Sequence, residues 1–150
     1  MAHTYLTDMK PIKVSGAISS GTGTTTTTGV DNKYGTRFRW YVVVGSITST
    51  GTITCSIEGS TDGTNYSAVT PEEGGTAETV VTDDTAGGKI LLLEVVNPDP
   101  NLKKLRLKIV RAVANSDIVV AMCHVDRLRV DSIASDSNCL PAAHIYGATV

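Results

Sequence analysis

The sequence predicts an all-β protein, built as a single antiparallel β-sandwich or jelly-roll-like barrel of about eight strands with extended N- and C-terminal arms. Three observations support this fold class. Apolar and polar residues alternate in several segments, and Gly, Pro, Asn and Asp turn signals recur about every 8–12 residues. The 150-residue chain is also rich in Thr, Val and Gly, with only 5% aromatic residues, which is a β-sheet composition rather than a helical one.

The stretch 36–69 organises the prediction, because its pattern predicts three consecutive antiparallel strands. One face of the first strand carries the only Trp and the only Phe of the chain, in the set Phe38, Trp40, Val42 and Val44. Large aromatic rings bury the most apolar area per residue, so this face is the expected centre of the core. The second strand covers 52–58, and Asp62-Gly63 predicts a tight turn into the third, because such turns need a positive φ.

The remaining elements follow from alternation and turn signals. Further strands are expected over 11–18, 77–82, 89–96, 102–113 and 118–125. The expected core residues of the last two are Leu105, Leu107 and Ile109, and then Ile118, Val120 and Met122 or the opposite set of that strand. The resulting organisation is an N-terminal arm over 1–10, a β-domain over 11–128 and a C-terminal arm over 129–150.

Two segments have an unusual composition. Segment 19–29 is rich in Thr and Gly and has no apolar residues, which favours an exposed loop or edge. Segment 89–96 is nearly all apolar, which favours a strand that is buried on both faces or that crosses an interface. A helix of about two turns is the alternative for this segment, because Gly and Pro bound it on both sides.

The net charge of −2 and the pI of about 5.9 argue against a nucleic-acid-binding protein, which is normally basic over the whole domain. The basic residues of 103–111 and 127–129 alternate with apolar ones, as on the outer face of strands. No segment reaches the ~20 apolar residues of a membrane helix, and the N-terminus lacks the pattern of a secretory leader. Three cysteines, an odd number, suggest free thiols in a reducing compartment.

No catalytic or cofactor-binding constellation is visible, so we expect a non-enzymatic protein without a cofactor or metal. Cys123 and His124 are neighbours in a predicted strand, so they point to opposite faces and cannot act as nucleophile and base. A zinc site from these two with Cys139 and His144 lacks the spacing of structural zinc sites. A Cys123–Cys139 disulfide that tethers the tail is the stronger alternative. The loop at Asp62 lacks the ligand pattern of a calcium site.

Two segments resemble structural proteins of tailed bacteriophages. They are LTDMKP at 6–11 and the predicted hairpin SIEGSTDGTNYSAV at 56–69, which matches the pattern E-x-S-x-D-G/N-x-x-[FYW]-x-x-V. Within this group the chain is similar to capsid decoration (cement) proteins and related head-associated proteins. The resemblance spans roughly residues 6–125, and the segment 126–150 has no counterpart in it.

The resemblance implies a non-enzymatic virion structural protein that binds the outer surface of an expanded capsid and stabilises it by bridging capsid subunits. The implied partners are the major capsid protein and further copies of the chain, as a homotrimer at three-fold positions, with no nucleic acid and no membrane. The implied location is the capsid exterior, after synthesis in the host cytoplasm. The rival hypothesis is a carbohydrate-binding or adhesin β-domain of a phage tail or baseplate, which would present exposed aromatic platforms.

Contacts with other subunits are expected in both arms and in the apolar segment 89–96. Leu91, Leu92 and Leu93 follow one another, so they cannot all face one core, and some apolar side chain is presented to another subunit. The arms carry apolar side chains without the periodicity of a core. The predicted interface residues are Tyr5, Leu6, Met9, Leu91, Leu92, Leu140, Ile145 and Tyr146.

Overall fold

The computed structural model describes residues 9–70, 79–82 and 87–126. In these residues nine strands form one antiparallel sheet, which confirms the all-β prediction. The strands are β1 (Met9–Ser15), β2 (Ile18–Thr26), β3 (Val30–Asp31), β4 (Arg37–Ile47), β5 (Thr52–Ser60), β6 (Ser67–Ala68), β7 (Thr79–Thr82), β8 (Ile90–Val96) and β9 (Lys104–Asp126). A three-residue 3-10 helix, Asn32–Tyr34, follows β3.

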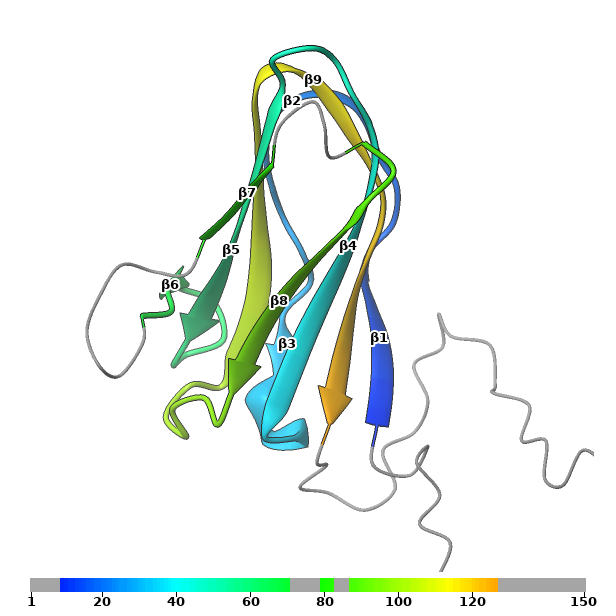
Figure 1. Cartoon of the computed structure of the whole chain (residues 1–150). Coiled ribbons are helices and arrows are strands. Elements are labelled where there is room, and N and C mark those ends of the chain that lie inside the picture. The colour runs from blue at the N-terminus through cyan, green and yellow to red at the C-terminus, as the bar shows by residue number, and fades with distance from the viewer. Residues whose placement is uncertain (1–8, 71–78, 83–86, 127–150) are drawn as a thin grey trace, which may run out of the picture.

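Strand β9 is the centre of the sheet, because it is 23 residues long and pairs with five other strands. Its first half pairs with β5 on one side and with β2 and β3 on the other. Its second half pairs with β4 on one side and with β1 on the other. Between the halves Val113 adopts a positive φ of 68°, and the strand bends. Figure 1 shows β9 bending at the same end of the molecule at which β4 leads into β5.

This bend, which we call the corner, folds the sheet into two layers. The first layer has the strand order β8-β4-β9-β1. In the second layer β9 lies between β5 and the strands β2 and β3, and the short strands β6 and β7 pair with the far side of β5. Because β1 leads into β2, and β4 leads into β5, each of these chain segments contributes one strand to each layer (Figure 1).

The core lies between the two layers and includes the predicted face of β4. Phe38 and Trp40 are fully buried there, and their rings stack with centroids 6.1 Å apart. Every second residue of the long strands points inward, as a half-buried strand requires. The core residues are Val14, Val30, Phe38, Trp40, Val42, Val44, Ile53, Cys55, Ile57, Leu93, Leu105, Leu107, Ile109, Ile118, Ala121, Cys123 and Val125.

The first two strands predicted in 36–69, β4 and β5, are present but do not pair with each other. Each pairs with β9, because β9 is long enough to offer a partner in both layers. The turn between them, with Thr50 at φ 68°, carries the chain around the corner. Strands β5 and β6 do form the predicted hairpin, with Glu58 opposite Ala68 and with Gly63 at φ 89° in the turn.

The two strands predicted over 102–113 and 118–125 are a single strand, β9. The predicted inward set of its first half is confirmed, whereas a register shift relative to β4 changes the inward set of the second half. Ile118 is buried as predicted, and Val120 and Met122 lie on the outer face instead. The inward residues after the shift are Ala121, Cys123 and Val125. Segment 19–29, predicted as a loop or edge, contains most of strand β2.

A buried arginine joins the layers on the inside of the corner. The Nη1 atom of Arg111 donates hydrogen bonds of 2.7 Å to the backbone carbonyls of Ser19 in β2 and Ser116 in β9. Beside it, Asp117 accepts a 2.8 Å hydrogen bond from the backbone N–H of Ser46 in β4, and its contacts with Ser46 lower the pKa of this carboxyl group. Polar contacts therefore link the strands where they bend.

Candidate functional site

Strand β8 is an edge of the first layer. It pairs with β4 over its whole length of seven residues, from Ile90 opposite Val43 to Val96 opposite Arg37, without a register shift. In the part of the chain that the structure describes, no strand pairs with the other side of β8. An edge of this kind presents unpaired backbone N–H and C=O groups to any other extended chain.

The side chains of β8 alternate between the core and the outer surface. Leu93 is buried, and Leu91 and Val95 pack against the core. On the outer face Ile90, Leu92 and Val96 are 61%, 51% and 52% exposed. The prediction of a strand buried on both faces is therefore wrong, and the alternative, that the three leucines do not all face one core, is confirmed for Leu92.

A groove lies on the inner side of this edge at the C-terminal end of β8, where the first layer faces the short strand β6 of the second. It has a volume of about 630 Å³. Apolar side chains from both layers line it, together with backbone and polar groups of the loop after β8. The lining residues are Ile57, Gly59, Ser67, Ala68, Val69, Thr70, Glu94, Val95, Val96, Asn97, Pro98, Asp99 and Leu102.

The only charged residue of β8 is held by its neighbour. Glu94 lies on the outer face, and one of its carboxylate oxygens accepts a hydrogen bond from Arg37 Nε in β4. This bond lowers the pKa of Glu94. On the other side of β4, Arg39 donates a hydrogen bond to the Asp126 carboxylate of β9. The only charge on β8 is thus paired within the layer.

The other edges of the described sheet are short, irregular or contain proline. Strands β6 and β7 have two and four residues. The pairing of β2 with β9 shifts register twice, and Gly23 in β2 has a φ of 125°. Strand β1 contains Pro11 and two lysines. Natural sheets carry such features at their edges because they hinder pairing with another chain. Strand β8 has none of them.

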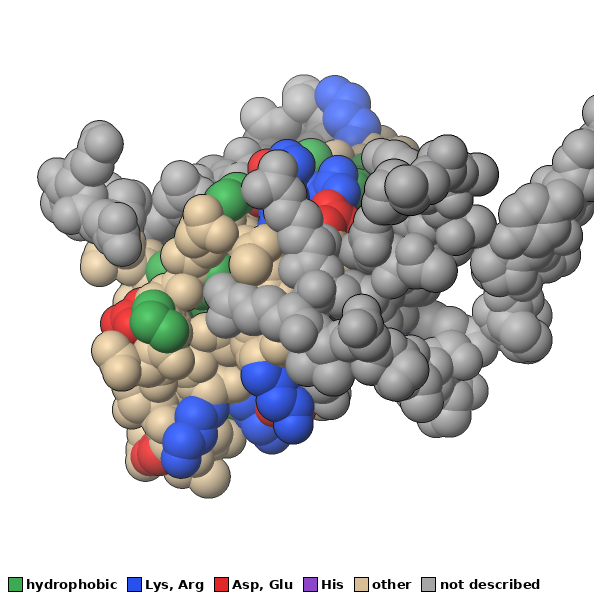
Figure 2. All heavy atoms as spheres, turned by 90° about the horizontal axis from the view of Figure 1, so that it is seen from below, with side chains coloured by type: hydrophobic (Ala, Val, Ile, Leu, Met, Phe, Trp, Pro, Cys, Tyr) green, Lys and Arg blue, Asp and Glu red, His purple; other side chains and the backbone are tan. Residues whose placement is uncertain are grey.

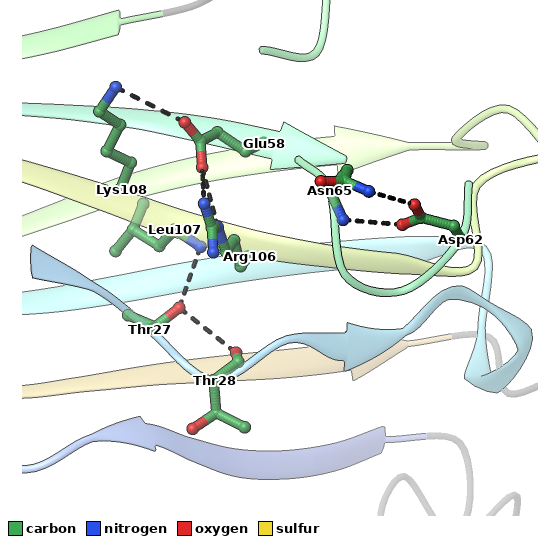
Figure 3. Close-up of polar contacts among 8 residues, drawn as sticks. All are labelled: Thr27, Thr28, Glu58, Asp62, Asn65, Arg106, Leu107 and Lys108. Atoms are coloured by element: carbon green, nitrogen blue, oxygen red, sulfur yellow. Dashed lines mark hydrogen bonds and ion pairs between the residues drawn. The ribbon is translucent and has the colours of Figure 1, made fainter. Parts of the chain in front are cut away.

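The hairpin that carries the phage-protein resemblance is held by its own polar contacts (Figure 3). In the turn, Asp62 accepts hydrogen bonds of 2.7 Å from the backbone N–H groups of Thr64 and Asn65, and these bonds lower its pKa strongly. Its second oxygen accepts a 2.6 Å bond from the Asn65 amide. Both carboxylate oxygens therefore bond within the turn, which gives Asp62 a structural role.

A cluster of charged and aromatic side chains covers the outer face of the second layer beside this hairpin. Arg106 Nη2 lies 2.7 Å from a carboxylate oxygen of Glu58, and Lys108 Nζ lies 3.6 Å from the other oxygen (Figure 3). The Arg106 guanidinium also stacks 3.9 Å from the ring centre of Tyr66. Arg106 and Lys108 of β9 are therefore on the outer face of the strand, as predicted, and both pair with Glu58. Arg111 of the same strand is buried at the corner instead.

Basic and acidic residues lie together at the end of the molecule opposite the corner. A hollow of about 530 Å³ there is lined by Asp31, Asn32, Lys33, Asp62, Gly63, Pro100, Leu102, Lys103 and Lys104. Figure 2, viewed from this end, shows blue side chains in separate groups with red ones beside them. The described residues of this end thus mix both signs of charge, unlike the uniformly basic surface that binds nucleic acid.

The cysteines and the histidine of the described strands follow the prediction from alternation. Cys123 points into the core as a free thiol, and His124 lies on the outer face, with its ring edge-on to Tyr41 at 5.1 Å. Burial raises the pKa of the Cys55 thiol to about 12 and that of Cys123 further still, so neither is a reactive thiolate. Burial and then Arg39 lower the pKa of His124.

Cys123 is a free thiol enclosed by the core, and Cys139, its partner in the alternative disulfide, lies outside the described residues. Among the described residues, no group of three or more His, Cys, Asp or Glu side chains could hold a metal ion. The described part of the chain also has no helix long and apolar enough to cross a membrane.

The predicted interface residues have different outcomes. Leu92 is on the exposed side of β8, and Leu91 packs against the core. Met9 is the first residue of β1, opposite Asp126, and thus belongs to a strand rather than to a free arm. The other predicted interface residues, Tyr5, Leu6, Leu140, Ile145 and Tyr146, lie outside the described residues. Sequence reasoning missed Ile90 and Val96, although their spacing of two and four residues from Leu92, which puts all three on one face of a strand, was the available signal.

No protein-family model matches the sequence, and no curated protein matches it. Two solved structures are similar to parts of the chain. One is a Bacillus endospore appendage, from a novel family of disulfide-linked pili, with 16% identity, a TM-score of 0.44, and coverage of 80% of this chain and 89% of that one. The other is a chain of the infectious bursal disease virus Gt strain, with 11% identity, a TM-score of 0.39, and coverage of 79% and 33%.

Proposed function

We propose that the chain is a non-enzymatic structural protein of a tailed-phage virion. It binds the outside of the capsid as a homotrimer and stabilises the shell by bridging neighbouring capsid subunits. It acts on the capsid exterior after synthesis in the host cytoplasm, without a cofactor. The hairpin resemblance at 56–69 suggests the class of protein, and the observation that carries the proposal is the apolar, unprotected edge at β8.

The edge supports a binding role because an added strand gains main-chain hydrogen bonds without a preformed pocket. An added strand would also cover Ile90, Leu92 and Val96. Each is about half exposed, so covering it would contribute about 1 kcal/mol of apolar burial, from which the cost of ordering the partner is subtracted. Such contacts are individually weak. On a closed shell many identical copies would sum them through multivalency.

The described aromatic residues argue against the rival, a carbohydrate-binding or adhesin domain of a tail or baseplate. Sugar-binding platforms need an exposed ring face. Phe38 and Trp40 are fully buried. Tyr41 is half-buried beside His124, and Tyr66 is covered by Arg106. The rings that remain belong to tyrosines whose side chains lie outside the described residues.

The test is co-sedimentation with expanded, undecorated capsids of the phage that encodes the chain. We expect saturable binding and a higher melting temperature of the decorated capsid. Leu92→Lys would place a charge in the middle of the β8 edge, so it should weaken capsid binding at least about tenfold while the isolated domain stays folded.

Val113→Lys is the matched control. Like Leu92, Val113 is an exposed aliphatic residue, but it lies at the corner, away from β8. It should bind capsids like the wild type. A chain that does not sediment with capsids, or that binds a glycan array in a tyrosine-dependent manner, would contradict the proposal and favour the rival.

A further inference from the structure

We infer that the β8 edge accepts the C-terminal segment 144–150 of a neighbouring copy of this chain as an added strand, with its inward side chains in the groove between β8 and β6. The inference deepens the proposed structural role. It rests on one part of that role, namely that copies of the chain assemble with one another. It identifies both the acceptor and the donor of the contact between copies.

The acceptor has two apolar sides that an added strand would cover together. Successive side chains of a strand point to opposite faces, so a strand beside β8 would place one set over the groove and the other on the outer surface. The set over the groove would contact Val95 and, across the groove, Val69. The outer set would lie beside Ile90 and Leu92. Directly opposite side chains on neighbouring strands come within about 5 Å and interact.

The C-terminal segment 144–150 has a sequence that fits this acceptor as the donor strand. Segment 144–150, HIYGATV, has seven residues, as β8 has, and contains no proline. Ile, Tyr, Thr and Val are residues that favour strands, and four of the seven belong to these types. The N-terminal segment 1–8, MAHTYLTD, contains only Thr4, Tyr5 and Thr7 of such types and ends directly at β1.

The intervening chain is long enough to reach a neighbouring copy. Strand β9 ends at Asp126, which lies in one row with Arg37 and Val96 across the layer. From there to a strand beyond β8 of the same copy is three strand spacings, or roughly 14 Å. The residues 127–143 reach roughly 55 Å when extended. The connection is thus several times longer than its own edge requires and is long enough to span to another molecule.

The test uses the full chain with the photo-cross-linking amino acid p-benzoylphenylalanine in place of Leu92. Leu92 is half exposed and outside the core, so the substitution leaves the fold intact. After irradiation of the free protein, we expect covalent dimers on a denaturing gel, with the cross-linked peptide containing residues 144–150. The matched control carries the same amino acid in place of Lys13, which is exposed on β1, the other edge of the layer, and should give no dimer.

A second variant tests the donor. Gly147→Pro removes a backbone N–H and restricts the segment, so it should lower the yield of dimers at least about tenfold. Ser137→Pro, in the connection, should leave the yield unchanged. A monomer-sized product joined to its own tail, a dimer joined through β8 of both copies or through residues 71–78, or no cross-link would each overturn the inference. Because no capsid is present, these results are independent of the co-sedimentation that tests the proposed function.

Discussion

Strands β8 and β1 are the two edges of the same layer, yet they differ in protection against pairing with another chain. Strand β1 contains Pro11, lysines at 10 and 13, and a register shift next to Ser15. Strand β8 pairs in continuous register, contains no proline or lysine, and exposes Leu92 and its outer neighbours. Proline, lysine and irregular pairing are the features by which natural sheets block their edges.

The difference lies only on the outward sides of the two strands. Both edges send apolar side chains into the core, and Val14 of β1 is as well buried as Leu93 of β8. The core thus requires similar residues at both edges and does not explain why one is blocked. An unblocked apolar edge promotes aggregation unless it has a partner. Its presence opposite a blocked edge supports β8 as the side of the molecule that binds.

The largest expected effect is a difference in stability loss between substitutions on the inner and the outer side of β8. Leu93→Ala should lower the free energy of unfolding by about 2–5 kcal/mol, because Leu93 is buried between the layers and a cavity would remain. Leu92→Ala should change it by less than about 1 kcal/mol, because the side chain is half exposed. Urea unfolding of both variants measures the difference. Equal losses would show that the outer side of β8 belongs to the fold and is not available to a partner.

The next prediction removes the protection of β1. The double variant Pro11→Val with Lys13→Leu should give β1 an edge like that of β8, and self-association should increase by about tenfold or more in sedimentation velocity. Lys103→Leu, an exposed lysine outside the strands, serves as the control for added hydrophobicity and should have little effect. If the double variant and the control associate equally, proline and lysine do not account for the difference between the edges.

The smallest expected effect concerns the charge on β8. Arg37 holds the pKa of Glu94 below its ordinary value, so ionised Glu94 stabilises the folded state above the unfolded-state pKa of about 4.3. This contribution is lost as the pH falls through the lower folded-state value. Because the pair is partly exposed, Glu94→Gln should cost less than about 1 kcal/mol at pH ~7.

Thermal melts of wild type and Glu94→Gln measure this contribution. The two proteins should differ slightly at neutral pH and converge once Glu94 is protonated in both states. A difference that persists unchanged in acid would show that the Glu94 side chain acts through packing rather than through its charge.

The local elements were predictable because they depend on short-range patterns. The inward face of β4, with Phe38 and Trp40, follows from a period of two, and the turn at Gly63 follows from its need for a positive φ. The inward cysteines and the outward His124 follow from the same alternation. For the second half of β9 the sequence left both faces open, because one register shift exchanges the two faces and leaves no clear mark in the sequence.

Pairing between distant strands was not predictable in the same way. Adjacent strands joined by a turn usually pair with each other, but β4 and β5 do not. Strand β9 separates them, because its Val113 bend keeps one strand continuous through both layers. The candidate site was not predictable for a similar reason. Whether a leucine-rich strand such as β8 is central or at an edge depends on which strands flank it, and local sequence does not give this.

The all-β class, the inward faces of most strands, the hairpin at Asp62 and the need for one of three consecutive leucines to leave the core could be predicted from the sequence alone. These features depend on residues close together in the chain. The fold of the sheet around a corner, and the place of β8 as an edge that no other described strand covers, beside a groove, became visible only in the tertiary structure. Those features depend on contacts between β9 and strands up to about a hundred residues away in the sequence. No local pattern encodes the loop-closure entropy or the packing of such contacts.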